Sequence, residues 1–446
     1  MNIAMIHFRV GATDGVSLEM DKWRTVLENL GHRVIYVAGE SSETETRWIE
    51  HLSLKDPMHL KIYRNAYESL ADYTDGKELL LDIFRMADTI REKLVRIVRE
   101  ERIELIIPNN IGSLGLNLSA AIAITETIEQ MDLECIYHHH DFFWERKRYA
   151  HPTTPLIDEI LRRYVPASNG VHCVINSIAK DELRARKGIE ATVVPNVFNF
   201  DRKPWVRDEY NRDLRPRLGI RARDIVFLQA TRIEDRKAIE LAIDAIERFR
   251  NRLSDRIGDE LYNGITVTED TRIFLLIAGM NELKTERFAV LKDRIDRATF
   301  DIELINDIVA SERKRIDHTK IYSLWDVYSA CDFVTYPSVL EGWGNQFIEA
   351  VFARKPVLAY EYPVFQRDIA PLGFSVVSLG HEHTTDEDGL FRVEDDALER
   401  AAIGIERILF DASLYAKTTE ENELIARRDL SYDRLTSILK NIMDNI

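Results

Sequence analysis

The segment YPSVLEGWGNQFIEA, residues 336–350, decides the architecture because it reads as a strand end, a turn with two glycines and a helix start. A strand that passes through a short turn into a helix is the repeating unit of parallel α/β sheets. The first N–H groups of a helix have no intrahelical partner and lie at the positive end of its dipole, which suits a phosphate. Gly342 and Gly344 let a ligand approach the backbone closely. The segment therefore predicts a diphosphate site at the carboxyl edge of a sheet.

Two glutamates bracket this turn. Glu349 is four residues after Asn345 and shares its helix face, while Glu341 lies just before the helix. A carboxylate can accept two hydrogen bonds from a vicinal diol, so one glutamate can serve each sugar of a nucleotide sugar. The pattern is also typical of an ordinary helix start, in which Glu341 complements the dipole and Glu349 is a solvated surface acid.

The same alternation of short apolar runs and helical patterns extends in both directions. It begins at residues 3–8, continues through a loop with Gly11 and Gly15, and enters a helix with one apolar face. We expect strands in a first sheet at 34–38, 105–107, 135–137, 171–175 and 192–194. The pattern restarts with expected strands at 225–229, 273–278, 302–305, 333–336, 357–359 and 374–377. Strands that alternate with helices predict an α/β protein with two Rossmann-like, doubly wound parallel sheets.

The length of 446 residues exceeds what one hydrophobic core usually supports, so two domains are expected. We place them at 1–205 and 206–412, with helices at 413–446 that pack back toward the first domain. Residues 41–101 are mostly charged, show no clear strand and are interpreted as a helical insertion. Open α/β sheets bind ligands outside the carboxyl ends of their strands, so the cleft between the halves is the expected active site.

Composition narrows the class of protein. The formal net charge is -16 and no long basic run is present, which argues against a nucleic-acid partner. No apolar run approaches the length of a membrane span, and the N-terminus lacks the pattern of a secretory signal. Three widely separated cysteines indicate buried free thiols in a reducing compartment, so we expect a cytoplasmic protein. The composition says nothing about oligomeric state.

A second charged segment, residues 229–237, follows the first strand of the second domain. Arg232 offers a planar fork and Lys237 a point charge, and both suit a diphosphate leaving group. The alternative is a charged loop whose ion pairs to Glu234 and Asp235 are internal.

A histidine segment, residues 137–141, follows a strand of the first domain, and one of its histidines can hydrogen-bond a donor sugar or its phosphate. A metal site at His138 and His140, or a satisfied structural cluster, are the alternatives. Polar residues at 109, 110 and 113 follow another strand and predict an acceptor pocket, although ordinary loop polarity also accounts for them.

Together these segments resemble the large retaining glycosyltransferase family 4, which has the GT-B architecture. The hallmark of that family, two glutamates separated by seven residues after Pro-Ser and around Gly-x-Gly, is met by Glu341 to Glu349. Its Arg followed five residues later by Lys is met by Arg232 and Lys237, although the usual glycine after that Lys is Ala238. The sequence at residues 13–17 and 139–142 is similar to that of a branch of the family that includes mannosylglucosylglycerate synthases.

The resemblance implies a role for each matching residue. Glu349 would bind the ribose, Glu341 the sugar, and Arg232 and Lys237 the diphosphate, while His140 would contact the sugar from the first domain. The expected catalytic residues are His140, Arg232, Lys237 and Glu341. The expected donor-binding residues are Gly15, Arg232, Lys237, Glu341, Gly342, Trp343, Gly344, Asn345, Gln346 and Glu349. The expected acceptor-binding residues are Asp14, Asn109, Asn110, Ser113 and His139.

Chemistry of this family would move a hexose from GDP-mannose or UDP-glucose to a hydroxyl of a small polar or saccharide acceptor, with retention and attack from the face that the diphosphate leaves. The resemblance implies neither a metal ion nor a cofactor besides the nucleotide sugar. Two other functions remain open from the sequence: hydrolysis or epimerisation of a nucleotide sugar, and a two-domain sugar binder without turnover. Nucleotide release only with an acceptor, release without one, or no release would separate the three.

Overall fold

The apolar run near the N-terminus forms the centre of the first sheet. Residues Ile3 to Ile6 are fully buried in β1 (Asn2–Val10), because a strand covered on both faces needs apolar side chains on both. Ile3 lies opposite Val34 on one neighbouring strand and Leu105 on the other, both in parallel register. The computed structural model describes residues 1–11, 14–43 and 45–446.

The first sheet has seven strands in the order β3-β2-β1-β4-β5-β6-β7. Its order reverses between β1 and β4, and loops at such a switch point diverge to leave room for a ligand. The other strands are β2 (Arg33–Ser41), β3 (Thr46–Trp48), β4 (Leu105–Pro108), β5 (Glu134–His139), β6 (Val171–Val174) and β7 (Thr192–Val193). The helices of this unit are α1 (Gly15–Asn29), α2 (Pro57–Tyr67), α3 (Gly76–Glu101), α4 (Leu118–Met131), α5 (Pro155–Tyr164), α6 (Ser177–Lys187) and α14 (Tyr432–Met443).

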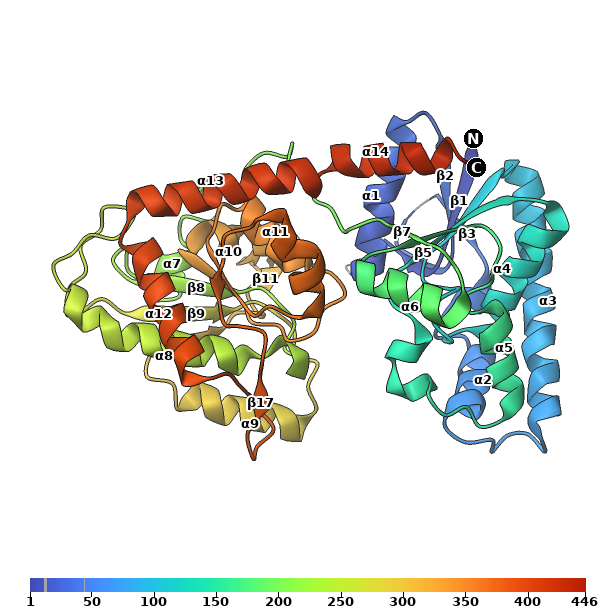
Figure 1. Cartoon of the computed structure of the whole chain (residues 1–446), viewed down its shortest axis with the longest axis horizontal. Coiled ribbons are helices and arrows are strands. Elements are labelled where there is room, and N and C mark those ends of the chain that lie inside the picture. Colours follow the sequence, from blue (N-terminus) through green and yellow to red (C-terminus); the bar gives the residue numbers. More distant parts are fainter. Residues whose placement is uncertain (12–13, 44) are drawn as a thin grey trace. The chain divides into compact units, whose positions relative to one another are not determined.

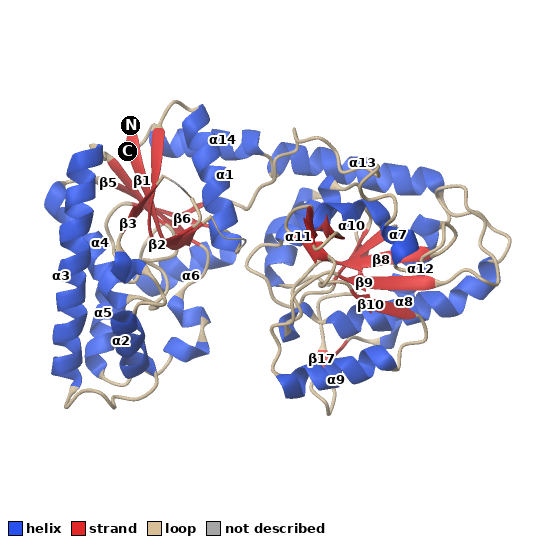
Figure 2. Cartoon of the chain, turned by 180° about the vertical axis from the view of Figure 1, so that it is seen from behind, coloured by secondary structure: helices blue, strands red, loops and turns tan. Residues whose placement is uncertain are grey.

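Helices cover both faces of this sheet (Figure 2). One core contains side chains of α3, α4 and α5, and the other contains Trp23 of α1 together with Leu435 and Leu439 of α14. The last helix of the chain thus returns to the first sheet, whereas α13 (Ala412–Asp429) belongs to the second unit, and both chain ends lie in the first unit (Figure 1).

The second sheet has six strands in the order β10-β9-β8-β14-β15-β16, all parallel. Numbered along the chain this is 3-2-1-4-5-6, the order of dinucleotide-binding Rossmann folds, with the switch point between β8 and β14. The strands are β8 (Ile225–Gln229), β9 (Ile273–Ile277), β10 (Asp301–Leu304), β14 (Phe333–Tyr336), β15 (Val357–Ala359) and β16 (Val377–Ser378). The helices are α7 (Leu214–Arg217), α8 (Ile239–Leu253), α9 (Thr285–Asp296), α10 (Leu324–Ala330), α11 (Asn345–Phe352), α12 (Asp395–Leu409) and α13 (Ala412–Asp429).

Smaller strands lie outside these two sheets. β11 (Val309–Ala310), β12 (Lys314–Ile316) and β13 (Thr319–Ser323) form a three-stranded sheet, and β17 (Thr384–Thr385) pairs with β18 (Phe391–Arg392). The insertion at 41–101 was expected to lack strands, and this expectation was wrong. It contains β3, whose three residues are too short to show a period and which pairs only with β2 at the sheet edge.

The chain divides into two compact units, residues 1–197 with 432–446, and residues 198–431. From the sequence, these divisions were expected at 205/206 and 412/413. Cys135, Cys173 and Cys331 are all buried and unpaired. Among the described residues, no helix combines the length and apolar character that crossing a membrane requires.

Candidate functional site

The switch point of the second sheet brings together the two charged segments that the sequence singled out. The loop after β8 carries Arg232 and Lys237, and the loop after β14 carries Glu341. A backbone hydrogen bond joins the loops, because the N–H of Val339 donates to the carbonyl of Arg236 at 2.9 Å. Residues about a hundred positions apart therefore form one polar cluster.

Glu341 is the centre of this cluster. Its carboxylate accepts a hydrogen bond from the Arg236 guanidinium at 2.6 Å and another from the Lys237 ammonium. Burial lowers the pKa of Lys237, and Glu341 opposes this shift. Burial acts in the same direction on Arg236, but Glu341 and Glu234 outweigh it and raise the pKa of that guanidinium. Both cations thus face one enclosed carboxylate at the helix start.

Arg232 lies at the rim of the cluster rather than at its centre. Its guanidinium donates to Glu282 at 2.8 Å, and its side chain is 51% exposed. From the sequence, Arg232 and Lys237 were expected to bind the diphosphate, and Arg236 was not. The 3-10 turn at 235–237 directs the last two of its residues to Glu341, and nothing in the spacing of the charges distinguishes Arg236 from its neighbours.

The turn before α11 is built around Gly344, whose φ of +140° and ψ of 57° suit glycine. A Cβ on Gly344 would lie 2.6 Å from the Tyr362 hydroxyl. That buried hydroxyl donates a hydrogen bond to the carbonyl of Trp343 and so fixes the turn from its buried side. Trp343 is 4% exposed, and its indole Nε1 has no partner among the described residues.

Three of the expected donor-binding residues form the partly exposed side of this helix start. Glu341, Asn345 and Glu349 are each neither buried nor fully exposed, whereas Gln346 is 6% exposed and reaches the carbonyl of Thr335 at 3.4 Å. The carboxylate of Glu349 accepts a hydrogen bond from the buried Tyr328 hydroxyl at 3.1 Å, which orients it.

The first unit has its own switch point, between β1 and β4. Asp14 caps α1, and its carboxylate accepts from the N–H groups of Val16 and Ser17 at 3.2 Å each. A Cβ on Gly15 would meet no described atom within 4 Å, so the space above this helix start is open. Ala12 and Thr13 of the same loop lie outside the described residues.

Four of the expected acceptor residues form a buried network beside this switch point. The Asn110 side-chain oxygen accepts from Ser113 at 3.0 Å and from the N–H groups of His140 and Asp141. Since Ser113 donates to Asn110, His139 Nδ1 must donate to Ser113, and His139 Nε2 then accepts from His172 Nδ1 at 2.9 Å. The side-chain oxygen of Asn109 is hydrogen-bonded to His138 Nδ1 at 3.0 Å. These side chains therefore fix the position of the segment that carries His140.

The ring Nε2 of His140 is enclosed without a partner among the described residues, as is that of His172. Burial lowers the pKa of His140 to about 4, although Asp141 opposes the shift. The ring is therefore neutral at pH 7 and offers a hydrogen bond rather than a charge. Within the described residues, no group of three or more His, Cys, Asp and Glu side chains is arranged to hold a metal ion.

Comparison with known proteins identifies similar chains along the whole length. The model of the family "Glycosyl transferases group 1" matches residues 211–374, which include both loops of the Glu341 cluster. The mannosylglucosylglycerate synthase of Petrotoga mobilis is 40% identical over 92% of this chain and 94% of its own. The mannosylglucosylglycerate synthase of Thermotoga maritima is 39% identical over 98% of this chain and 99% of its own.

Solved structures show the same fold at low identity. A glycosyltransferase from Rickettsia africae aligns with a TM-score of 0.62 and 12% identity, covering 100% of this chain and 99% of its own. Anabaena Alr3699/HepE in complex with UDP and glucose aligns with a TM-score of 0.61 and 14% identity, covering 100% of both chains. The two-sheet GT-B architecture expected from the sequence is thereby confirmed.

Proposed function

The chain belongs to the group 1 glycosyltransferases, in the branch of the mannosylglucosylglycerate synthases, and from this we propose that it transfers mannose from GDP-mannose to glucosylglycerate with retention. The observation that carries the donor half of the proposal is the pairing of Arg236 and Lys237 with Glu341 at the start of α11. The acceptor comes from the names of the two relatives. UDP-glucose is the other donor that we test.

The proposed reaction needs positioning and charge stabilisation. The acceptor hydroxyl oxygen bonds to the anomeric carbon on the face from which the diphosphate departs, and the bond from that carbon to the phosphate oxygen breaks. The leaving phosphate oxygen takes the hydroxyl proton, so the products are the glycoside and the nucleoside diphosphate. Arg232, Lys237 and the N-terminus of α11 stabilise the charge that develops on the leaving group.

The remaining residues recognise the substrates. We assign Glu341 and the turn at 342–346 to the sugar and diphosphate of the donor, and Glu349 to its ribose. In the first unit, we assign His140 to sugar recognition and Gly15 to the floor beside the reacting carbon. We assign Asp14 to the acceptor, with Asn109, Asn110, Ser113 and His139 holding the acceptor side in shape through their buried network.

A donor and acceptor screen tests the proposal. Purified protein is incubated with GDP-mannose or UDP-glucose, with glucosylglycerate, glycerate or no acceptor, and with or without EDTA. We expect release of GDP only with glucosylglycerate, little effect of EDTA, and an anomeric coupling in the product NMR spectrum that matches the donor. Release without an acceptor would instead support a hydrolase, and no release with any pair would support a non-catalytic binder. Activity abolished by EDTA and restored only by a divalent ion would overturn the assignment of charge stabilisation to Arg232, Lys237 and α11.

A further inference from the structure

A pocket separate from the candidate donor site lies in the second unit, at the outer edge of its sheet. We call it the α12 pocket. It has a volume of about 410 Å³ and lies between α12, the start of α13 and the segment around the edge strand β16. None of the residues assigned to the donor or the acceptor lines it. The lining residues are Ser375, Val376, Val377, Ser378, Gly380, Arg400, Gly404, Arg407, Ile408, Leu414 and Thr418.

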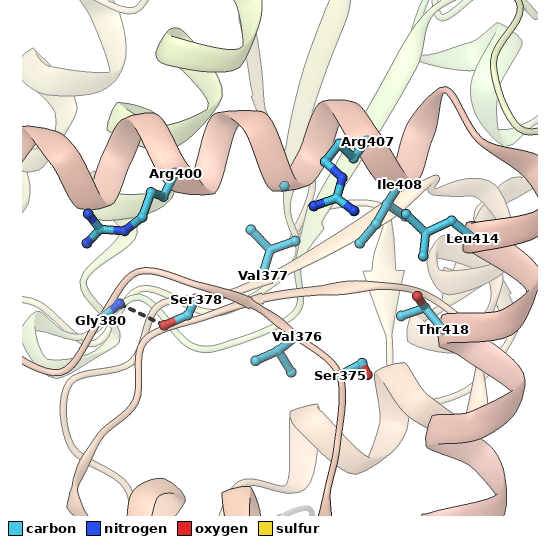
Figure 3. A pocket seen from close by; sticks show the side chains of 11 residues that line it. Ser375, Val376, Val377, Ser378, Gly380, Arg400, Arg407, Ile408, Leu414 and Thr418 are labelled. Atoms are coloured by element: carbon cyan, nitrogen blue, oxygen red, sulfur yellow. Dashed lines mark hydrogen bonds between the residues drawn. The ribbon is translucent and has the colours of Figure 1, made fainter.

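Two arginines of α12 flank this pocket without a charged partner. Arg400 and Arg407 lie four residues before and three residues after Gly404, so the three share one helix face. Figure 3 shows the two arginines on α12. A Cβ on Gly404 would lie 3.0 Å from a methyl group of Val377, so the helix packs closely on β16 at this point. Neither arginine makes an ion pair or hydrogen bond with any described residue.

Two acidic residues of α12, in contrast, have charged partners. Glu399 and Glu406 of the same helix are paired with Arg252 of α8, at 2.8 and 2.6 Å. The chain as a whole carries 76 acidic and 60 basic residues, so partners for a cation are abundant. Unpaired arginines beside a pocket in an acidic protein favour an anionic ligand.

A threonine hydroxyl also faces the α12 pocket. Thr418 is 6% exposed, and its hydroxyl has no partner among the described residues. The adjacent Thr419 makes the usual helical bond to the carbonyl of Tyr415 at 3.0 Å, but Thr418 does not. The Thr418 hydroxyl is turned toward the pocket instead (Figure 3), so it is available to a ligand there.

The lining therefore combines three chemistries. Val377, Ile408 and Leu414 provide an apolar floor, Thr418 a hydroxyl, and the two arginines a cationic rim. The volume lies within the usual range for small-molecule pockets, roughly 300–1,000 Å³. We propose that the α12 pocket is a regulatory site for a small polyhydroxy anion, a sugar phosphate or a sugar acid.

A chain of contacts leads from this pocket to the turn at Gly344. The Ser378 hydroxyl donates to Glu361 at 2.6 Å and accepts from the N–H of Gly380 at 2.9 Å. The next residue, Tyr362, donates to the carbonyl of Trp343 and lies against Gly344. A ligand that shifts the segment after β16 would therefore act on donor binding, and this half of the proposal rests on the proposed function.

Binding is tested first and without any activity assay. Calorimetric titration compares glucose 6-phosphate, gluconate and uncharged glucose with the native protein, the double variant Arg400→Ala/Arg407→Ala, and Thr418→Val. The matched control is Arg250→Ala, another exposed arginine without an ion pair that lies outside the pocket. We expect one or both anions to bind, glucose to bind at least tenfold more weakly, and the double variant to lose at least tenfold in affinity. Anion binding that is absent, or equal in the double variant and the control, would overturn the site.

Regulation is tested second, by donor KM with and without the anion that binds. We expect a change in KM of at least twofold in the native protein, and loss of this change with retained binding in Ser378→Ala. Binding without any effect on KM would overturn the regulatory role. If the protein turns over no donor at all, the proposed function fails while the titration still decides whether the site exists.

Discussion

At the scale of single residues, the candidate donor site is a carboxylate held between two cations. An enclosed charge is costly unless it is paired, and Glu341 is paired on both of its oxygens by Arg236 and Lys237. The charge of Lys237 is thereby committed to Glu341, and a diphosphate must compete for it. The same contact keeps the ammonium group in place before the donor arrives, so little reorganisation is needed when negative charge develops.

The role of Lys237 is tested by its removal. Lys237→Ala leaves Glu341 paired with Arg236, so we expect the fold to persist and kcat to fall by about 10²-fold or more, the loss typical of one charge-stabilising group. The measurements are kcat from nucleotide release and the melting temperature. Lys292→Ala, a surface variant whose lysine pairs with Asp296, serves as the control with unchanged kcat. An unchanged kcat in Lys237→Ala with a lowered melting temperature would assign Lys237 a structural role instead.

Gly15 allows a test of open space in the first unit. A Cβ there meets no described atom within 4 Å, and its φ lies outside the left-handed region, so Gly15→Ala does not strain the fold. If the reacting sugar occupies that space, the variant keeps its melting temperature and loses at least tenfold in kcat/KM. Full activity in this variant would show that no substrate comes near Gly15.

The sequence predicted part of this site, for a physical reason that differs from residue to residue. Glu341 and Lys237 were found because a strand end followed by charged residues marks the carboxyl edge of a sheet. Arg236 was missed because adjacent charges look alike until a turn directs them. Trp343 and Gln346 were expected to bind the donor, and both residues are less than 7% exposed. Whether a side chain near a turn points into solvent or into the core depends on packing, which the sequence pattern does not reveal.

At the scale of elements, the start of α8 explains an unusual residue. Ala238 has φ 47° and ψ 48°, the left-handed conformation that favours the glycine usual in the resembled family. We therefore expect Ala238→Gly to change the free energy of unfolding by less than about 0.5 kcal/mol, because relief of strain offsets the lost methyl group and the added chain entropy. The matched control, Ala242→Gly in the helical interior, is expected to cost about 1–2 kcal/mol. Equal losses in chemical denaturation would contradict this explanation.

Three buried histidines, one in β1, one directly after β5 and one in β6, make the first unit sensitive to acid. Burial lowers the pKa of His7, His140 and His172 to about 4 each, against the ordinary 6.5. A histidine whose pKa is lower in the folded than in the unfolded protein contributes its full stabilisation above the unfolded pKa of about 6.5. As pH falls from there toward the folded pKa of about 4, the free energy of unfolding decreases by about 1.4 kcal/mol per pH unit for each such histidine.

We therefore expect the free energy of unfolding of the first unit to fall steeply between pH 6.5 and pH 4. Chemical denaturation at pH 7.5, 6.0 and 5.0, followed by tryptophan fluorescence, measures this free energy. The variant His172→Asn is expected to show a shallower dependence on pH. The exposed His381→Ala serves as the control with the native slope. A slope that is the same in all three proteins would show that these histidines do not set the pH dependence.

Central strands were predictable, whereas the edge strands β3 and β16 were not. Buried central strands such as β8 and β14 are continuous apolar runs, and the expected ranges 225–229 and 333–336 match the structure. The edge strand β16 was expected at 374–377 and lies at Val377–Ser378, because an edge strand pairs on one side only and its apolar residues also serve the adjoining loop. The small sheet of β11 to β13 was missed because its strands have only two, three and five residues, which is too short to show a clear period.

At the scale of the whole molecule, the first unit is completed by the end of the chain. Leu435, Leu439 and Ile442 of α14 are buried in the same core as Trp23 of α1. Burying a side chain of this size contributes roughly 1.5–3 kcal/mol, so the three together contribute about 5–9 kcal/mol. Total stabilities are typically about 5–15 kcal/mol, so the first unit depends on α14.

Deletion of residues 432–446 tests this dependence. We expect calorimetry of the truncated protein to retain the unfolding transition of the second unit and to lose that of the first. Within the full chain, Leu439→Ala should destabilise the first unit by about 2–5 kcal/mol, while its exposed neighbour Lys440→Ala changes little. Retention of both transitions after the deletion would show that α14 is dispensable.

The return of α14 also sets an order of events on the ribosome. About 230 residues separate the first stretch of this unit from its last helix. At roughly 5–20 residues per second, the face of α1 that α14 covers stays open to solvent or to chaperones for about 10–50 seconds after residue 197 is translated. The second unit emerges entirely within that interval, so the unit whose synthesis starts first is the one whose folding is completed last.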